Sequence, residues 1–193
     1  MTAPTPSAPT VVVVSGNPRP GSRTLGAAEA AARRIATVLG FDDVATIDLA
    51  TFAAEILAPE HPAADAAKER LAGATVAVIA TPVYKASYTG LLKSFLDLYG
   101  NSGLAGVVAV PLVVSGSPAH ALAGEVHLRP VLVELGAVVP ARSLTVTEAQ
   151  LADLDPVIDA WLERAGEPLR RATSPVAVLA GAGATALVEE VVR

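Results

Sequence analysis

The side chains best suited to bind a ligand lie in one loop, Ser15–Thr24, which directly follows the valine run Val11–Val14. β-branched residues favour a strand, and a run that is apolar on both faces is typical of the centre of a parallel sheet. The next predicted helix begins with free N–H groups and a positive dipole end, which attract anions. The small donors beside that helix start are Ser15, Asn17, Ser22 and Thr24. The loop therefore predicts a site for a phosphate or a similar anion.

The same loop allows a plainer interpretation, in which Ser22 caps the helix and the turn binds nothing. Its sequence matches neither the G-x-x-x-x-G-K-[ST] phosphate loop nor the dinucleotide fingerprint G-x-G-x-x-G. No motif therefore indicates a nucleoside triphosphate or a dinucleotide, and the loop alone leaves both interpretations open.

Two more polar loops follow apolar runs. Thr81–Tyr88 comes after the run at 75–80, and Ser115–His120 comes after the run at 107–114. The carboxyl ends of parallel strands share one edge of a sheet, and ligands bind there, where the strand order reverses. We therefore expect the three loops to meet at one site.

Strands and helices are expected to alternate five times, which predicts an α/β fold with a five-stranded parallel sheet between two helical layers. Pro111 and Pro140 are awkward within strands, and Pro130 is expected to kink or break a helix. The expected strands are 11–14, 44–49, 75–80, 107–114 and 137–146. The expected helices are 22–39, 63–72, a helix from 91 onward, 119–136 and 148–165.

The composition excludes several classes of protein. A net charge of −5 argues against non-specific binding to nucleic acid. The chain has no cysteine, so thiolate nucleophiles and Cys-ligated metals are ruled out, and its three histidines lack a metal-site spacing. No apolar stretch is long enough to span a bilayer, and the first residues do not resemble a signal peptide. We therefore expect no metal and no membrane partner, and a cytoplasmic location.

Two motifs together resemble the NADPH-dependent FMN reductase family of flavodoxin-like proteins. They are SGNPRPGSRT at 15–24 and ATPVYKASYTGLLKSFLDL at 80–98. The stretch SGSPAHALAGEVHLRPVLVEL at 115–135 is similar to the bacterial members that supply reduced flavin to sulfonate monooxygenases. The resemblance covers about residues 11–161. It implies a flavodoxin-like FMN-binding domain at 10–172, between a flexible tail at 1–9 and an extension of unknown structure at 173–193.

The resemblance also implies which residues bind the cofactor FMN, and it implies no catalytic side chain. The loop that grips the flavin phosphate is matched by Ser15, Asn17, Arg19, Ser22, Arg23 and Thr24. The segment along the ribityl chain and the ring edge is matched by Pro82, Val83, Tyr84 and Lys85. The loop beside the pyrimidine side of the ring is matched by Ser115, Gly116 and Ser117. Tyr84 could instead be a packing residue, and Arg23 could be only a solvated residue of the first helical turn.

The function that the resemblance implies is hydride transfer from NADPH or NADH to FMN, with a flavin-dependent monooxygenase as a possible partner. An FMN-containing quinone or azo reductase is the alternative among enzymes, and a flavodoxin-type electron carrier is the alternative outside them. Such carriers usually clamp the ring with aromatic residues, whereas only 4% of this chain is aromatic. A non-enzymatic phosphate-binding module is a further alternative.

An oligomer is also expected. The helix at 119–136 is apolar over much of its circumference, as is typical of a helix covered on more than one side. The apolar positions concerned are Val126, Leu128, Val131, Leu132 and Leu135. The resemblance implies a homodimer or homotetramer. It also implies an inserted residue that forms a π-bulge in this helix, at the positions of Val126 and His127 here, although His127 could instead be an ordinary surface or core histidine.

Overall fold

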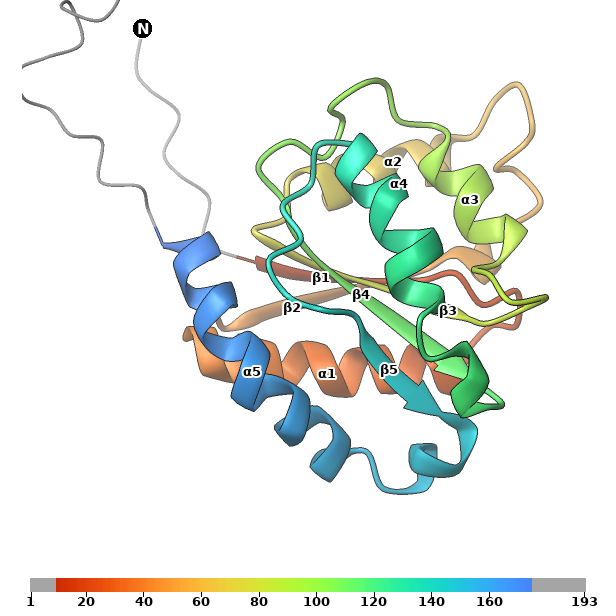
Figure 1. Ribbon diagram of the computed structural model, residues 1–193. Helices are drawn as coiled ribbons and strands as arrows, with labels where there is room; N and C mark the ends of the chain where they lie inside the picture. The colour runs from red at the N-terminus through yellow and green to blue at the C-terminus, as the bar shows by residue number, and fades with distance from the viewer. Residues whose placement is uncertain (1–9, 175–193) are drawn as a thin grey trace, which may run out of the picture.

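The computed structural model describes residues 10–174, which form a parallel five-stranded sheet between two layers of helices (Figure 1). The strands are β1 (Thr10–Ser15), β2 (Asp43–Asp48), β3 (Val76–Pro82), β4 (Val108–Ser115) and β5 (Leu144–Thr147). Their order is β2-β1-β3-β4-β5, and every neighbouring pair is parallel. Because β2 and β3 flank β1 on opposite sides, the strand order reverses at the carboxyl end of β1. This is the flavodoxin-like α/β sandwich that the sequence predicts.

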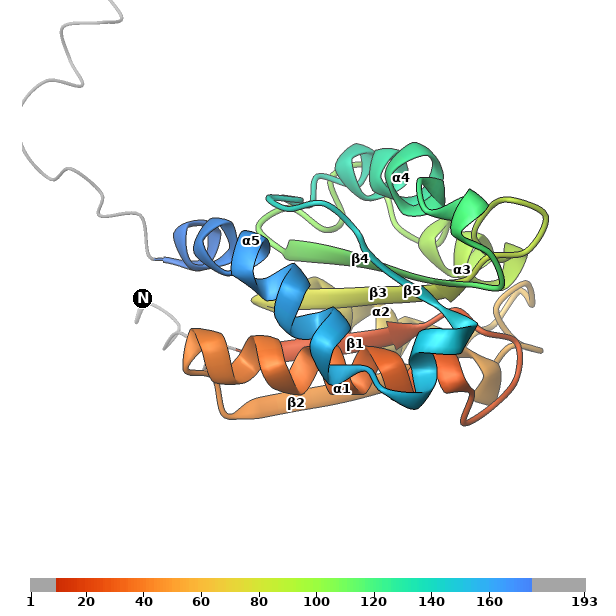
Figure 2. The ribbon, with the colours of Figure 1, turned by 60° about the horizontal axis from the view of Figure 1, so that its bottom comes forward.

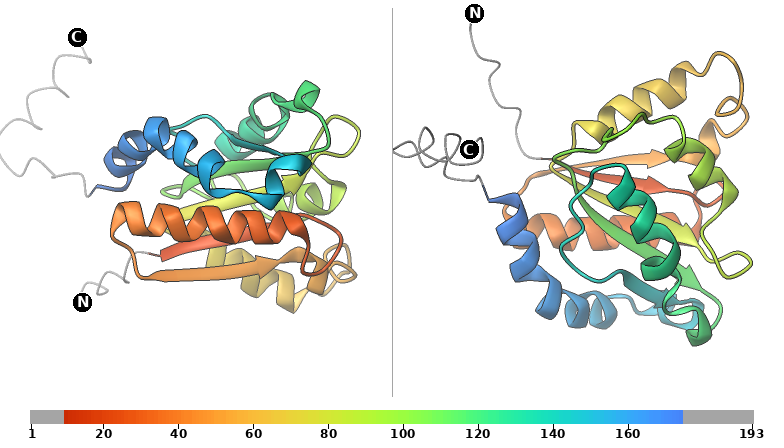
Figure 3. Two further views of the ribbon diagram at one scale, coloured as in Figure 1. Left: turned by 90° about the horizontal axis from the view of Figure 1, so that it is seen from below. Right: turned by 45° about the horizontal axis from the view of Figure 1, so that its top comes forward.

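The helices form one layer on each face of the sheet (Figures 2 and 3). One face carries α1 (Arg23–Leu39) and α5 (Asp155–Thr173), and the other carries α2 (Pro62–Ala72), α3 (Gly90–Leu96) and α4 (Arg129–Glu134). The valines of β1 fill both layers: Val11 and Val13 pack in the core under α1 and α5, while Val12 and Val14 pack in the opposite core. Because all four are at most 2% exposed, the apolar run is explained by burial on both faces.

The predicted elements up to residue 115 are confirmed, with ends that shift by one or two residues. Local chemistry explains the bounds of α1. Ser22 Oγ accepts the Leu25 amide at 3.2 Å and caps the start of the helix. Gly40 ends it with φ of 72°, a left-handed conformation that glycine adopts without a steric penalty.

Pro111 lies inside β4 without breaking the sheet. The Ala109 amide donates to Val138 O on the β5 side of β4, so the nitrogen of Pro111, two residues on, faces the same side. The pairing between β4 and β5 begins only at Leu112. The donor that proline lacks therefore falls where no ladder hydrogen bond is made.

The helix expected at 119–136 is present but shorter and less regular than predicted. The segment begins with a 3₁₀ turn at Pro118–His120, continues as a π-helix at Gly124–Leu128, and becomes α4 at Arg129. Pro130 lies inside this continuous helical run, directly after the π-helix, in which the Arg129 amide donates to Gly124 O. The irregularity that the sequence predicts around Pro130 is therefore present, as a π-helical turn directly before it.

The last two predicted elements also need correction. The strand expected at 137–146 is reduced to β5, preceded by a lone bridge between Val108 and Val138. The helix expected at 148–165 begins as a 3₁₀ turn at Glu148–Ala152. It resumes as α5 and reaches Thr173, with Pro168 inside it.

The predictions of a flexible tail at 1–9 and of an extension beyond α5 concern residues outside the described range, apart from 173 and 174. None of the helices found in residues 10–174 combines the length and apolar character that a bilayer-crossing segment requires.

Candidate functional site

A cavity of about 330 Å³ opens at the carboxyl edge of the sheet, where the strand order reverses. We call it the loop cavity. Its walls come from the β1–α1 loop, the ends of β3 and β4, and the turn after β5. The lining residues are Asn17, Arg19, Pro20, Gly21, Ser22, Arg23, Thr24, Pro82, Val83, Tyr84, Val114, Gly116, Glu148 and Leu151. The three predicted loops therefore meet at one site, as the sequence indicates.

The β1–α1 loop is held in shape by side chains that bond to its own backbone. Asn17 Oδ1 accepts the Arg19 amide at 3.0 Å, and Asn17 Nδ2 donates to Thr24 Oγ1 at 3.1 Å. From the end of β2, Asp48 Oδ2 accepts the Gly21 amide at 2.9 Å. Gly21 has φ of 62°, which suits glycine. The loop is thus preformed around the cavity.

The N-terminus of α1 forms the cationic end of the cavity. The Leu25 amide bonds to Ser22 Oγ and the Gly26 amide to Ser22 O, at 3.2 and 3.1 Å. No acceptor within the described part of the chain takes the amides of Arg23 and Thr24, which line the cavity. Two free amides at a positive helix end are the elements of an anion site.

Buried hydroxyl groups fasten this loop to the β3–α3 segment. Thr89 Oγ1 donates to Gly16 O at 2.6 Å and accepts the Leu92 amide at 3.1 Å, so it caps α3 as well. Thr81 Oγ1 accepts the Thr89 amide at 3.1 Å. A Cβ added to Gly16 would lie 2.6 Å from Leu92 Cβ, so only glycine permits this close approach. These contacts therefore fix the distance between two walls of the loop cavity, the β1–α1 loop and the β3–α3 segment.

Tyr84 stands at the base of a tight turn on the cavity wall. The amides of Tyr84 and Ser87 each donate to the other's carbonyl, at 2.8 and 3.1 Å. Between them Lys85 and Ala86 have φ of 50° and 66°, as a type I′ turn requires. Non-glycine residues in this region cost about 1–3 kcal/mol each, and such strain clusters at binding sites. The turn leaves Tyr84 45% exposed beside the cavity.

Several predicted site residues lie off the cavity wall. Ser15 is fully buried and its Oγ has no hydrogen-bond partner in the structure. Ser115 is also buried and donates its hydroxyl to Ser117 O at 2.9 Å, while Ser117 Oγ accepts the Ala119 amide. Lys85 is exposed in the turn next to Tyr84. Ser115 and Ser117 thus shape the third loop, and from that loop Gly116 reaches the cavity.

Sequence reasoning missed two wall residues, Glu148 and Leu151, from the turn after β5. They could have been found by extending the strand-end argument to the fifth strand, whose carboxyl end shares the same edge. Glu148 forms an ion pair with Arg23, with Nη2 and Oε2 3.2 Å apart. The cavity therefore combines two guanidinium groups, from Arg19 and Arg23, with one carboxylate.

A second, larger hollow of about 800 Å³ lies beside the outer strand β5, between the π-helix and α5. We call it the edge groove. Its lining residues are Ala121, Leu122, Glu125, Pro140, Ala141, Arg142, Ser143, Leu144, Thr145, Gln150, Pro156, Val157, Ala160, Trp161, Arg164, Ala165 and Pro168. None of the predicted site residues lines it.

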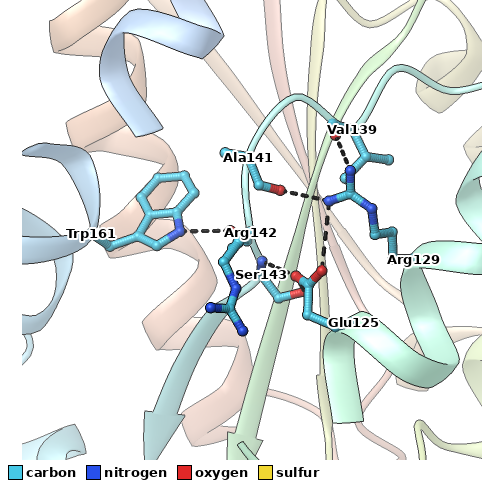
Figure 4. Close-up of polar contacts among 7 residues, drawn as sticks. All are labelled: Glu125, Arg129, Val139, Ala141, Arg142, Ser143 and Trp161. Atoms are coloured by element: carbon cyan, nitrogen blue, oxygen red, sulfur yellow. Dashed lines mark hydrogen bonds and ion pairs between the residues drawn. The ribbon is translucent and has the colours of Figure 1, made fainter. Parts of the chain in front are cut away.

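Polar side chains at the edge groove are bonded to the chain leading into β5 (Figure 4). Glu125 Oε1 accepts the Ser143 amide at 2.5 Å and the Ser143 hydroxyl at 2.8 Å. Arg129 donates to Ala141 O and Val139 O, at 2.9 and 2.7 Å. Burial acts to raise the pKa of Glu125, but the bonds from Ser143 and the nearby arginine charges outweigh it, so this pKa is lowered.

The π-helix carries Glu125 and also His127, at the position where the resemblance implies an inserted residue. Gly124 is required here, because an added Cβ would lie 2.6 Å from Ser143 Oγ. The predicted interface residues divide: Leu128 and Leu132 are fully buried in the core, whereas Val126 is 58% exposed. Core packing thus accounts for much of the apolar character that the sequence analysis assigned to an interface.

Comparison with known proteins agrees with this geometry. The family model described as NADPH-dependent FMN reductase matches residues 9–150. The FMN reductase (NADPH) of Escherichia coli is 36% identical over 147 residues, which are 74% of this chain and 75% of that protein. The NADH-dependent FMN reductase SfnF of Pseudomonas putida is 35% identical over 125 residues, which are 62% of this chain and 67% of that one.

A solved structure shows the same relationship. The apo form of the NADH:FMN oxidoreductase EmoB aligns with a TM-score of 0.70 and 32% identity, over 86% of this chain and 89% of that chain. The match of the family model over most of the sequence, together with these relatives, shows that the chain belongs to the NADPH-dependent FMN reductase family.

Proposed function

We propose that the loop cavity binds the phosphate of FMN and that the chain catalyses hydride transfer from NADPH or NADH to FMN. The observation that carries this proposal is the preformed β1–α1 loop, with two free amides and two guanidinium groups around one cavity. Family membership supports the same reaction, since the E. coli and P. putida relatives are named as FMN reductases.

The residues present fit the phosphate of FMN. The amides of Arg23 and Thr24 and the guanidinium of Arg19 supply donors, and charge-assisted bonds of this kind are the strong ones. Asn17 takes part through the loop, because both ends of its amide are bonded to it. The Ser22 hydroxyl accepts the Leu25 amide, which leaves its own proton free to donate to a phosphate oxygen.

The remaining wall residues are assigned to the rest of the flavin. Pro82, Val83 and Tyr84 on one side, and Gly116 on the other, would flank the ribityl chain and the ring. Lys85, Ser115 and Ser117 are assigned supporting roles in the loops that carry these contacts. We assign no contact to Ser15, because its side chain is fully buried.

The chemistry divides between the flavin and the chain. When bound, FMN takes up the hydride of the reduced nicotinamide as a two-electron carrier, which no protein side chain can do. The residues around the loop cavity would hold the phosphate, and Tyr84 on its wall would contact the ring. We assign no acid, base or metal ligand, so catalysis rests on placing two ring systems together.

Further expectations extend this proposal. SfnE and SfnF, both named as NADH-dependent, stand beside relatives named for NADPH, so either donor is consistent with the family. We also propose a cytoplasmic homotetramer that supplies reduced flavin to a monooxygenase. The exposed side chains Leu122, Val126 and Val133, near and on α4, support an assembly through that face.

Steady-state oxidation of NADPH and NADH, with and without added FMN, tests the proposed reaction. Oxidation that depends on free FMN and saturates with it is the expected result. Failure of both nucleotides to bleach bound FMN would instead favour an electron carrier. Faster turnover with a quinone than with FMN would favour a quinone reductase. Light scattering on the unmodified protein tests the assembly, since a 19.5 kDa particle at micromolar concentration would contradict it.

A further inference from the structure

One wall of the loop cavity carries a negative charge where the proposed ligand is an anion. Glu148 is the first residue after β5, and its carboxylate lies 3.2 Å from Nη2 of Arg23, which also lines the cavity. Arg23 is the first residue of α1, beside the two free amides. The pair thus joins the first and fifth strand-end loops at the place assigned to the phosphate.

Stability does not explain this pair. The side chains of Arg23 and Glu148 are 68% and 55% exposed, and exposed ion pairs contribute little to stability. The turn that carries Glu148 has its own fastening, because Gln150 Oε1 accepts both the amide and the hydroxyl of Thr147 at 2.9 Å. Removal of the Glu148 charge should therefore leave the fold intact.

The pair does change what the cavity offers to an anion. With Glu148 bonded to Arg23, one of the two cavity guanidinium groups already has a counter-charge. An incoming phosphate must share or displace that carboxylate, and it also meets direct repulsion from it. The other nearby carboxylate, Asp48, is different because it accepts the Gly21 amide and shapes the loop without lining the cavity.

We propose that Glu148, by pairing with Arg23, lowers the affinity of the loop cavity for the FMN phosphate, so that the flavin exchanges instead of remaining bound. This inference rests on the proposed function. An enzyme that hands reduced flavin to another protein needs such release, whereas one that keeps its flavin does not. A carboxylate near the phosphate would speed the dissociation of FMN without altering contacts to the ring.

The test compares FMN with riboflavin, which has the same ring and ribityl chain but no phosphate. In Glu148→Gln, the FMN dissociation constant should fall about three- to tenfold at low ionic strength, and FMN should dissociate more slowly in stopped flow. The riboflavin dissociation constant should stay unchanged. The gain for FMN should shrink as salt is added, because exposed charges are screened.

Two control variants separate this effect from others. Glu148→Asp keeps the charge and should retain the FMN affinity of the unmodified protein. Glu163→Gln changes the net charge equally at an exposed position of α5 outside the cavity wall, and should leave both dissociation constants unchanged.

The outcomes are distinct. Unchanged or weaker FMN binding in Glu148→Gln, or an equal shift for FMN and riboflavin, would overturn the role of Glu148 while leaving the proposed function standing. A protein that binds neither flavin before any substitution would overturn the proposed function itself.

Discussion

The loop cavity and the edge groove differ in the polar groups that they offer to a ligand. The edge groove is the larger, at about 800 Å³ against about 330 Å³. Two of its polar side chains bond to the chain entering β5, Glu125 to Ser143 and Trp161 Nε1 to Arg142 O at 2.8 Å, whereas the guanidinium groups of Arg142 and Arg164 make no hydrogen bond or ion pair within residues 10–174. In the loop cavity, the backbone is tied down while amides and charged groups are left for a ligand. What sets the loop cavity apart is therefore its pair of free backbone amides at the start of α1, and not its volume or its arginines alone.

This difference has a structural origin. The connection at 139–143 must lead from the lone bridge at Val138 into β5 without strand pairing of its own. Side chains from the π-helix, α4 and α5 supply the missing bonds to that backbone. At the loop cavity, by contrast, the neighbouring strands β1, β3 and β4 pair up to their carboxyl ends, and side chains such as Asn17 and Asp48 hold the loop that follows β1.

The largest effect is expected from Arg129→Met. This substitution removes donors from Val139 O and Ala141 O and leaves Glu125 without its ion-pair partner, 3.7 Å away. Partly buried carbonyls that lose a charged donor cost about 1–3 kcal/mol each, so the free energy of unfolding should fall by about 3 kcal/mol. Urea denaturation measures this fall. The FMN dissociation constant of the folded variant should not change. A loss of FMN affinity would contradict the assignment of Arg129 to the stability of the fold and not to the loop cavity.

Arg19→Ala should show the reverse pattern. Within residues 10–174 the Arg19 guanidinium makes no hydrogen bond or ion pair, although the residue lines the loop cavity. Loss of a charged donor to the phosphate should weaken FMN by about 2 kcal/mol, or roughly thirtyfold, with little change in unfolding. Fluorescence titration measures the affinity. Arg33→Ala, on an exposed position of α1, is the matched control for net charge; an equal effect of both variants would deny Arg19 a specific role.

The sequence predicts most of the fold because its signals are local and repeated. The apolar runs locate the five strands, and Ser22 and Gly40 mark the ends of α1. The segment 119–136 is mispredicted for a physical reason. A π-helix has the same apolar residues as an α-helix, so the hydrophobic spacing does not distinguish them, and the close packing of Gly124 against Ser143, 19 positions away in the chain, leaves no mark in that spacing.

The candidate site, like the fold, was predictable only in part. The loops were predictable, since each follows a strand and carries the right residue types. The direction of a single side chain was not. Ser15 has the same chemistry as Ser22, but it ends a central strand and is buried. The strand-end argument, extended to the fifth strand, could have placed Glu148 at this edge of the sheet, but its ion pair with Arg23 is visible only in the structure.

A smaller effect is expected at Tyr84. The type I′ turn holds this side chain at the loop cavity through backbone bonds alone, so Tyr84→Ala should leave unfolding unchanged. Loss of ring contact should weaken FMN by about 1 kcal/mol and alter the flavin absorption band. Tyr84→Phe keeps the ring and is expected to behave as the unmodified protein. A wild-type spectrum and affinity in Tyr84→Ala would assign the residue to packing.

The smallest expected effect is a pH dependence of the free energy of unfolding, which arises from Glu125 at the edge groove. The pKa of Glu125 is lower in the folded chain than its ordinary value of 4.5, because the bonds from Ser143 and the charges of Arg129 and Arg142 outweigh the opposing effect of burial. The carboxylate therefore stabilises the fold fully above pH 4.5, and this contribution is lost as the pH falls through the lowered pKa.

Glu125→Gln is the variant that isolates this dependence, because glutamine keeps an acceptor for Ser143 and removes the charge. Between pH 7 and pH 4, its free energy of unfolding should fall less than that of the unmodified protein. The pKa of Asp65 is also lowered, chiefly by its hydrogen bond from Lys68, but this group is exposed and its contribution should be screened by salt. The difference at Glu125 should persist at high salt, since that carboxylate is partly buried between the π-helix and the chain entering β5. If the free energy of unfolding falls equally in the two proteins, the charge of Glu125 does not contribute to stability, although its hydrogen bonds form.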